Sequence, residues 1–246
     1  MKIGLSALTH ELETAISICK NNHLNHIEVG IDNIEDCEIL EKYIDMIKEE
    51  NISIGIHLPM ELNTCENITY IRNKWIDYIH KLNKELKNID IEYFNLHLGY
   101  AMGTRLQKNR VKYLENSIKF LNKIDKDICV TIENTYSQKG DFTNIGNKVE
   151  DFEYIISNVS NNIHFCYDIG HDLIDSSSYI EKISSNIKVI HLSDNDGIED
   201  KHIGIGKGIL KEDNIKNMID AKPEYLVLEI IYDDLEISID RIKKYL

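Results

Sequence analysis

The chain has 246 residues, of which 42% are hydrophobic and 28% are charged. This composition is ordinary for a globular protein, so it excludes a disordered tail and a small disulfide scaffold, and the length is enough for one sizeable core. The 42 acidic residues exceed the 28 basic ones, and the resulting net charge of -14 opposes unaided binding to the phosphate backbone of a nucleic acid.

The longest apolar runs, residues 52–58 and 225–231, are much shorter than the roughly 20 residues that a bilayer-spanning helix needs. The sequence starts with a strand-like segment and shows no secretory signal pattern, so the expected location is the cytoplasm, with no membrane partner. Five cysteines, an odd number without a C-x-x-C pair, are expected to be small buried hydrophobic residues and not disulfide or zinc ligands.

Short strand-like runs alternate with stretches in which apolar residues recur every three or four positions, as in helices. The expected strands cover residues 2–6, 26–30, 52–57, 91–97, 128–133, 163–168, 187–192 and 225–230. The expected helices cover residues 9–21, 35–50, 66–88, 106–123, 147–158, 176–185, 211–220 and 234–245. Eight such units predict an α/β fold, a (β/α)8 TIM barrel forming a single domain over residues 1–246, with a doubly wound open sheet as the alternative.

The expected strands alternate between apolar and polar positions. In residues 52–57 the three isoleucines share one face, whereas Ser53, Gly55 and His57 share the other. The isoleucine face is expected to pack on helices, which leaves the other set pointing into the barrel. In six strands the last inward residue is titratable and lies at the C-terminal end, where barrel enzymes build their active sites.

Nine ligand-type side chains are expected to converge on this rim. Six end strands and three lie in the following loops: His57, His97, Glu133, Asp168, His191 and Glu229, with His171, Asp200 and His202. Imidazole and carboxylate groups suit zinc, manganese, iron or cobalt, so we expect a divalent-metal site with one to three ions, in which Glu133 can bridge two of them. The other histidines are expected to be surface or structural residues: His10, His23, His26, His80 and His164.

Three further features near this rim have two interpretations each. Glycines 204, 206 and 208 follow the Asp200–His202 segment and either bring backbone N–H groups close to a ligand or form a flexible turn. Glu28, which ends the second strand, either hydrogen-bonds a substrate hydroxyl or caps local backbone. Lys207 either meets a substrate phosphate or is a solvated surface lysine.

Taken together, these residues resemble the xylose-isomerase-like TIM barrel superfamily, which contains sugar phosphate isomerases and epimerases and the endonuclease IV-type abasic-site nucleases of AP endonuclease family 2. The resemblance spans almost the whole chain. It depends on the segments His57-Leu-Pro-Met-Glu-Leu-Asn63, His97-Leu-Gly99, Glu133-Asn-Thr135, Asp168-Ile-Gly-His171, His191-Leu-Ser-Asp-Asn195, Asp200-Lys-His202 with Ile205-Gly-Lys-Gly208, and Glu229.

The two branches of this superfamily imply different metal contents. Resemblance to the isomerases and epimerases implies one divalent ion, often manganese, with two of its ligands also moving protons and His171 touching substrate; those ligands would be Glu133, Asp168, His191 and Glu229. Resemblance to the nucleases implies three zinc ions. The first would bind His57, His97 and Glu133, the second the four residues just named, and the third His171, Asp200 and His202.

Two departures count against the nuclease. Met60 and acidic Glu61 stand where nuclease members carry a pair that wedges into DNA, and the loop at residues 30–36 is acidic. The leading prediction is therefore a divalent-metal-dependent isomerase or epimerase of a small sugar, sugar phosphate or polyol, with Glu133 and Glu229 exchanging the proton. A multinuclear zinc phosphoesterase is the alternative, and a binding protein without turnover is the third hypothesis. The expected partner is a small carbohydrate, nucleic acid is not expected, and the oligomeric state stays open.

Overall fold

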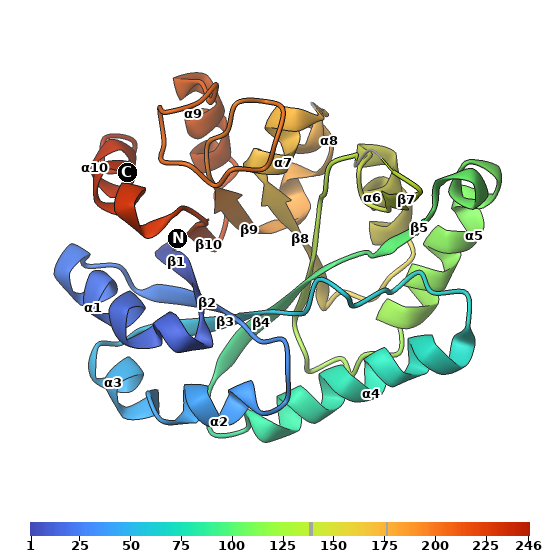
Figure 1. Ribbon diagram of the computed structural model, residues 1–246, viewed down its shortest axis with the longest axis horizontal. Coiled ribbons are helices and arrows are strands. Elements are labelled where there is room, and N and C mark those ends of the chain that lie inside the picture. Colours follow the sequence, from blue (N-terminus) through green and yellow to red (C-terminus); the bar gives the residue numbers. More distant parts are fainter. Residues whose placement is uncertain (138–139, 176) are drawn as a thin grey trace.

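The computed structural model describes residues 1–137, 140–175 and 177–246. Eight parallel strands close into a barrel in the order β1-β10-β9-β8-β6-β4-β3-β2, with β1 beside β10 (Figure 1). The barrel strands are β1 (Lys2–Leu8), β2 (His26–Gly30), β3 (Ser53–His57), β4 (Ile91–His97), β6 (Val130–Glu133), β8 (Ile163–Asp168), β9 (Ile187–Leu192) and β10 (Tyr225–Leu228). The predicted TIM barrel is confirmed, and the open sheet is excluded because the ring closes.

Helices surround the barrel, as the ribbon in Figure 1 shows. They are α1 (Leu12–Asn22), α2 (Asp36–Glu41), α3 (Ile44–Glu49), α4 (Thr69–Glu85), α5 (Gly103–Leu121), α6 (Val149–Ile156), α7 (Ile169–Ile174), α8 (Tyr179–Ile183), α9 (Glu212–Asp220) and α10 (Leu235–Ile242). Within the described part of the chain, none of these helices combines the length and the hydropathy needed to span a bilayer.

The elements differ from the prediction in three places. The helix expected at 35–50 is divided, because the N–H groups of Lys42 and Tyr43 bond to carbonyls three residues back and tighten the turn between α2 and α3. Two short strands were not predicted, β5 (Tyr100–Met102) and β7 (Phe142–Asn144), which pair antiparallel outside the barrel. Helix α7 was also missed, and it begins directly after Asp168, whose carboxylate accepts the N–H of His171 at 2.8 Å.

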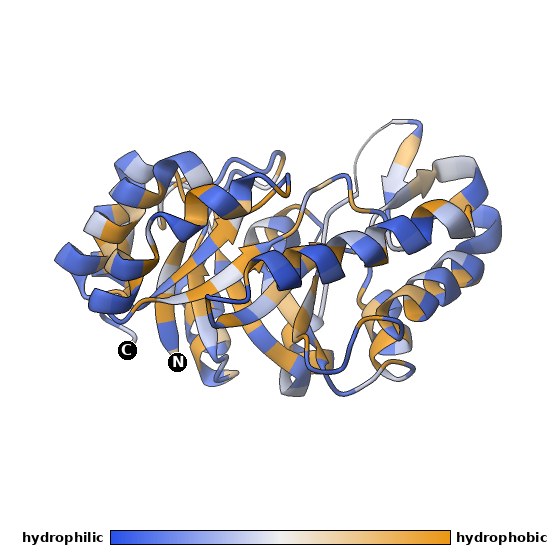
Figure 2. Cartoon of the chain, turned by 90° about the horizontal axis from the view of Figure 1, so that it is seen from below, coloured by the Kyte–Doolittle hydropathy of each residue, from blue (hydrophilic) through white to orange (hydrophobic). Residues whose placement is uncertain are grey.

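Two hydrophobic clusters support the barrel. The larger lies between the strands and the helices, and the smaller fills the barrel interior with Tyr93, Cys166, Val189, Tyr225 and Val227. Figure 2 shows the corresponding pattern of hydrophobic and hydrophilic stretches along strands and helices. All five cysteines are free; four are buried as predicted, whereas Cys129 is only partly buried.

His26, from β2, is fully buried inside the barrel, where a protonated imidazole is unfavourable. Burial, with a further contribution from Lys2, lowers its pKa to about 3. The unfolded chain binds a proton at this histidine below its ordinary value of about 6.5, whereas the folded chain does not. The contribution of His26 to the free energy of unfolding is therefore greatest above pH 6.5. It is lost as the pH falls towards 3, by up to about 1.4 kcal/mol per pH unit.

We expect His26→Gln to remove this contribution. Between about pH 7 and pH 5, the free energy of unfolding of the wild type should fall by about 2 kcal/mol more than that of the variant, measured by chemical denaturation. His10→Gln, at an exposed position, is the matched control for removal of one histidine. An identical pH dependence in His26→Gln and the wild type would contradict the assignment.

Candidate metal centre

The strand register brings the predicted ligands together at the C-terminal end of the barrel. Parallel pairing places His97 beside Glu133 and Asp168 beside His191. Glu229 follows β10 instead of ending it, and its N–H bonds to the carbonyl of Leu192 at 3.2 Å. Of these residues, His97, Glu133 and Glu229 line a cavity of about 610 Å3.

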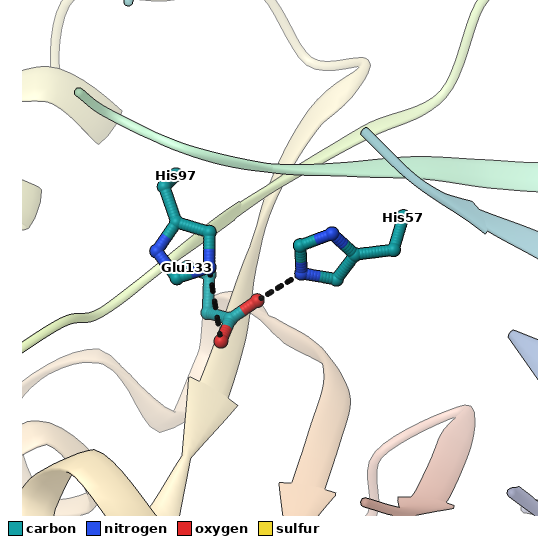
Figure 3. Close-up of side chains that lie close together, drawn as sticks. All are labelled: His57, His97 and Glu133. Carbon is teal, nitrogen blue, oxygen red and sulfur yellow. Dashed lines mark ion pairs between the residues drawn. The ribbon is translucent and has the colours of Figure 1, made fainter. Parts of the chain in front are cut away.

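The first cluster consists of His57, His97 and Glu133 (Figure 3). The two imidazoles approach the carboxylate from different directions. His57 Nε2 lies 3.4 Å from one oxygen of Glu133, and His97 Nε2 lies 3.6 Å from the other. Two imidazole nitrogens and a carboxylate oxygen facing a common point form a ligand set for a zinc-like ion.

The second cluster shares Glu133 with the first. Its ligand atoms lie within 4.8 Å of one another and come from Glu133, Asp168, His191 and Glu229. His191 Nδ1 is at the centre, 3.0 Å from Glu229 Oε2, 3.5 Å from Glu133 Oε2 and 3.9 Å from Asp168 Oδ2. One imidazole nitrogen facing three carboxylates is suited to a divalent cation, which would offset the negative charge.

The third cluster comprises His171, Asp200 and His202. Both imidazole Nε2 atoms lie 3.1 Å from the same oxygen, Asp200 Oδ2. His171 also lies 3.6 Å from Glu133 Oε1, so the third cluster adjoins the other two. All nine residues predicted as ligands therefore lie in three adjoining groups, and seven of them, all except Asp168 and His191, line the cavity.

Three of the histidines are oriented by hydrogen bonds between ring nitrogen Nδ1 and the backbone. The Nδ1 atoms of His57, His171 and His202 lie 2.8–3.0 Å from the backbone carbonyls of Leu58, Asn134 and Glu229, respectively. When the imidazole is neutral, as a metal ligand must be, Nδ1–H donates to such a carbonyl and the Nε2 lone pair is directed at the cluster. Metal-binding histidines in proteins have this arrangement.

The loop that carries the third cluster is held by a buried carboxylate. Asp194 accepts hydrogen bonds from the N–H groups of Gly206, Gly208 and Leu210 at 2.8–2.9 Å. A side chain at Gly208 would place Cβ 2.0 Å from the Asn195 carbonyl oxygen, so this close approach requires glycine. The glycines thus form a folded loop wrapped around Asp194, not a flexible turn.

Helix α10 anchors the same loop from the other side. Asp234 accepts the N–H of Gly204 at 2.9 Å, and Ser238 Oγ accepts the N–H of Ile205 at 3.1 Å. Arg241 donates to the carbonyl of Ile205. His202 sits at the start of this anchored segment with φ of 47°, a left-handed conformation that is uncommon outside glycine.

The electrostatic character of the centre follows from burial and from the alternation of acids and imidazoles. Burial would lower the pKa of His57, but the hydrogen bond and charge of Glu133 raise it to about 9. Burial raises the pKa of Asp168 to about 7. Cys166 also reaches Glu133 and His191, yet burial raises the pKa of its thiol well above the ordinary value, which makes it a poor ligand.

Several buried ligand atoms lack a hydrogen-bond partner among the described residues. Two of them, Asp168 Oδ2 and His191 Nδ1, belong to the second cluster, and Asp200 Oδ1 belongs to the third. Buried polar atoms without partners are costly, and native proteins rarely contain them. Their positions inside the ligand clusters fit bound divalent cations, so the residues present are suited to metal.

The two other predicted site residues lie in different surroundings. Glu28 is 1% exposed, at the floor of the cavity, and contacts His191 and Tyr93. Lys207 is half exposed, pairs with Asp234 and does not line the cavity.

Sequence reasoning missed Asn95, which donates from Nδ2 to Glu133 and accepts from Thr131 Oγ1 at 2.7 Å. The residue precedes His97 by two positions and shares its strand face, so the alternation that identified His97 could also have identified Asn95.

The cavity wall combines apolar and acidic side chains. Leu8, Met60 and Ile231 line the mouth and are each about half exposed, while Glu11 and Asp32 add negative charge. Over the residues that the structure describes, no lysine or arginine lines this cavity. Neutral or metal-bound polar ligands suit such a wall better than a free anion does.

Comparison with known proteins supports the assignment of the fold. The family model described as xylose isomerase-like TIM barrel matches residues 14–245. An uncharacterised protein of Methanocaldococcus jannaschii is 26% identical over 258 residues, covering 100% of both chains. A protein of Metamycoplasma arthritidis named probable endonuclease 4 is 28% identical over 217 residues, which cover 80% of this chain and 75% of that protein.

Among solved structures, a D-tagatose 3-epimerase-like protein superposes with a TM-score of 0.82 at 20% identity, covering 100% of this chain and 97% of the other. At this identity the likeness concerns the fold.

Proposed function

Because the chain belongs to the xylose isomerase-like TIM barrel family, whose similar proteins include both epimerase-like and endonuclease-like members, we propose that it is a divalent-metal-dependent isomerase or epimerase of a small sugar, sugar phosphate or polyol. The observation that carries the proposal is the cavity. Its volume of about 610 Å3 fits a small ligand, its floor holds carboxylates and imidazoles, and its described wall has no lysine or arginine that would bind a DNA backbone.

Glu229 is the principal proton acceptor in this proposal. Its side chain is 26% exposed, whereas that of Glu133 is 1% exposed and surrounded by imidazoles. Burial opposes ionisation of Glu229, but His191 and His202 hold its pKa at about 2, so the carboxylate is anionic. Glu133 is assigned the return of the proton from the opposite side of the reacting carbon.

A divalent ion held by Glu133, Asp168, His191 and Glu229 would polarise adjacent carbonyl and hydroxyl oxygens and acidify the C–H between them. His171 and the apolar mouth would orient the substrate and exclude water. Manganese and zinc both suit this ligand set. Lys207 lies outside the proposed site, because Asp234 binds its ammonium group away from the cavity.

Phosphoester hydrolysis is the second candidate function, and one observation favours it. In the third cluster the Nε2 atoms of His171 and His202 both lie 3.1 Å from Asp200 Oδ2, although proton transfer at carbon requires only one ion. Adjacent ions that clamp attacking and leaving oxygens suit hydrolysis. The acidic cavity wall favours a small phosphoester over a nucleic acid as the substrate of such an enzyme.

Solvent exchange tests the proposal. The purified protein, loaded separately with manganese and zinc, would be incubated in deuterium oxide with ketopentoses, ketohexoses and their phosphates. We expect mass spectrometry to detect one deuterium at the carbon next to the carbonyl of at least one sugar. Absence of exchange across the panel, together with zinc-dependent cleavage of a small phosphodiester, would overturn the proposal in favour of the hydrolase.

The variant His202→Ala distinguishes the two functions. Under the isomerase or epimerase proposal, deuterium exchange should persist in this variant, because His202 is not a ligand of the second cluster and only its charge beside Glu229 is lost. Under the hydrolase hypothesis, phosphodiester cleavage should fall more than about 100-fold, since losing a direct ligand exceeds the 10- to 100-fold effect typical of outer-shell changes. Lys201→Ala, in the same loop but paired with Asp196, controls for general loop disturbance.

A further inference from the structure

A continuous row of buried polar side chains crosses the barrel interior and ends at the metal centre. It runs through Ser53, His26, Tyr93, Glu28 and His191, which come from the four strands β2, β3, β4 and β9. The last four are at most 1% exposed. Burial of so many polar groups is costly unless each finds a partner, so the row requires a specific pattern of donors and acceptors.

The directions of these hydrogen bonds follow from the Glu28 end. A carboxylate only accepts, so the Tyr93 hydroxyl must donate to Glu28 Oε2, at 2.7 Å. The same hydroxyl has no second proton, so its oxygen accepts from His26 Nε2–H at 2.9 Å. His26 Nδ1 then carries the lone pair, and it lies 2.9 Å from Ser53 Oγ, whose hydroxyl is also 3.1 Å from the carbonyl of Asn25. Neutral His26 agrees with its fully buried position.

Space for this row is provided by a glycine. Gly55 lies beside Glu28 in the register of β2 and β3. A Cβ built on Gly55 would lie 2.4 Å from the Tyr93 ring, so any side chain there would displace the tyrosine that donates to Glu28. Tyr93 is in turn fixed by contacts with the rings of His26 and Tyr225, whose centroids lie 5.6 and 5.1 Å away.

At the other end, His191 presents its two nitrogens to different partners. Nε2 lies 3.0 and 3.1 Å from the two oxygens of Glu28, and Nδ1 faces Glu133, Asp168 and Glu229. A neutral imidazole has one N–H and one lone pair. We propose that Glu28 is a positioning residue that accepts the Nε2–H of His191, thereby fixing the tautomer and orientation in which Nδ1 is the metal ligand.

This role differs from contact with a substrate hydroxyl, which the sequence left open for Glu28. Glu28 Oε2 already accepts from the Tyr93 hydroxyl and lies 3.1 Å from His191 Nε2, and only 1% of the residue is exposed. The inference concerns metal binding at the second cluster and therefore applies to either reaction considered above. Its test uses metal affinity and does not require turnover.

Zinc affinity would be measured by competition with a chromogenic chelator for the wild type, Glu28→Gln, Tyr93→Phe and Glu11→Gln. We expect Glu28→Gln to weaken zinc binding by about 10- to 100-fold, as for other carboxylate partners of metal-binding histidines. Tyr93→Phe preserves the ring and removes one donor to Glu28, so a smaller loss is expected. Glu11 lines the same cavity without contacting His191, and Glu11→Gln should bind zinc as the wild type does.

A spectroscopic readout separates positioning from a general loss of structure. With 15N-labelled histidine and bound zinc, the wild type should show a His191 Nε2–H proton that exchanges slowly with solvent, and this signal should shift or disappear in Glu28→Gln. Affinity unchanged in Glu28→Gln, or reduced equally in Glu11→Gln, would overturn the proposal. If Glu28→Gln does not fold, wild-type affinity and an unshifted Nε2–H signal in Tyr93→Phe would overturn it.

Discussion

Replacing Glu229 by glutamine is expected to lower the rate of deuterium incorporation into substrate by about 10²- to 10⁴-fold, the usual contribution of a general base. Glutamine keeps the size of the side chain but cannot accept the proton. Glu229 is also a candidate ligand, so exchange and zinc occupancy must be measured on the same sample at saturating metal. Loss of exchange with full occupancy identifies Glu229 as the base.

A matched control removes the same charge elsewhere on the cavity wall. Asp32 lines the mouth but belongs to none of the ligand clusters, so Asp32→Asn should retain exchange. Exchange persisting near the wild-type rate in Glu229→Gln would remove Glu229 as the base. A similar loss in both variants would instead point to the overall negative potential of the cavity.

Zinc added to metal-free protein is expected to raise the midpoint of thermal unfolding by about 8–16 °C. At a free zinc concentration of about 1,000 times the dissociation constant, binding stabilises the folded state by about 4 kcal/mol, and for a chain of this size each kcal/mol shifts the midpoint by about 2–4 °C. Calorimetry on chelator-treated and zinc-reloaded samples would measure the difference.

The variant Glu133→Gln should abolish most of this zinc-dependent shift. Glu133 contributes to both the first and the second cluster, so one substitution affects two candidate sites. The exposed Glu150, which pairs with Lys182 on the surface, supplies the control Glu150→Gln and should leave the shift intact. A full shift in Glu133→Gln would show that the stabilising zinc binds elsewhere.

The barrel and its ligands were predictable because both follow from alternation along strands. In a parallel barrel, inward residues at strand ends must share one rim, so His57, His97 and Asp168 could be placed together before their distances were known. Glu229 follows its strand by one residue, yet the same parity still directs it to the rim.

Other features depend on tertiary contacts that leave no periodic signal. Strands β5 and β7 have three residues each, too few to show alternation, and they exist because their loops meet outside the barrel. The partner of Glu28 is equally invisible in sequence, since His191 is 163 positions away. Local patterns identify which residues face inward, whereas long-range packing decides which of them meet.

The anchoring of residues 204–205 by α10 has a consequence for the order of assembly during synthesis. All ligands of the first cluster have been synthesised once the chain reaches Glu133. All ligands of the third cluster have been synthesised once it reaches His202. However, the segment following His202 is held by Asp234, Ser238 and Arg241, which emerge from the ribosome almost last. We therefore expect the third cluster to form only when α10 docks, after every one of its own ligands has already been translated.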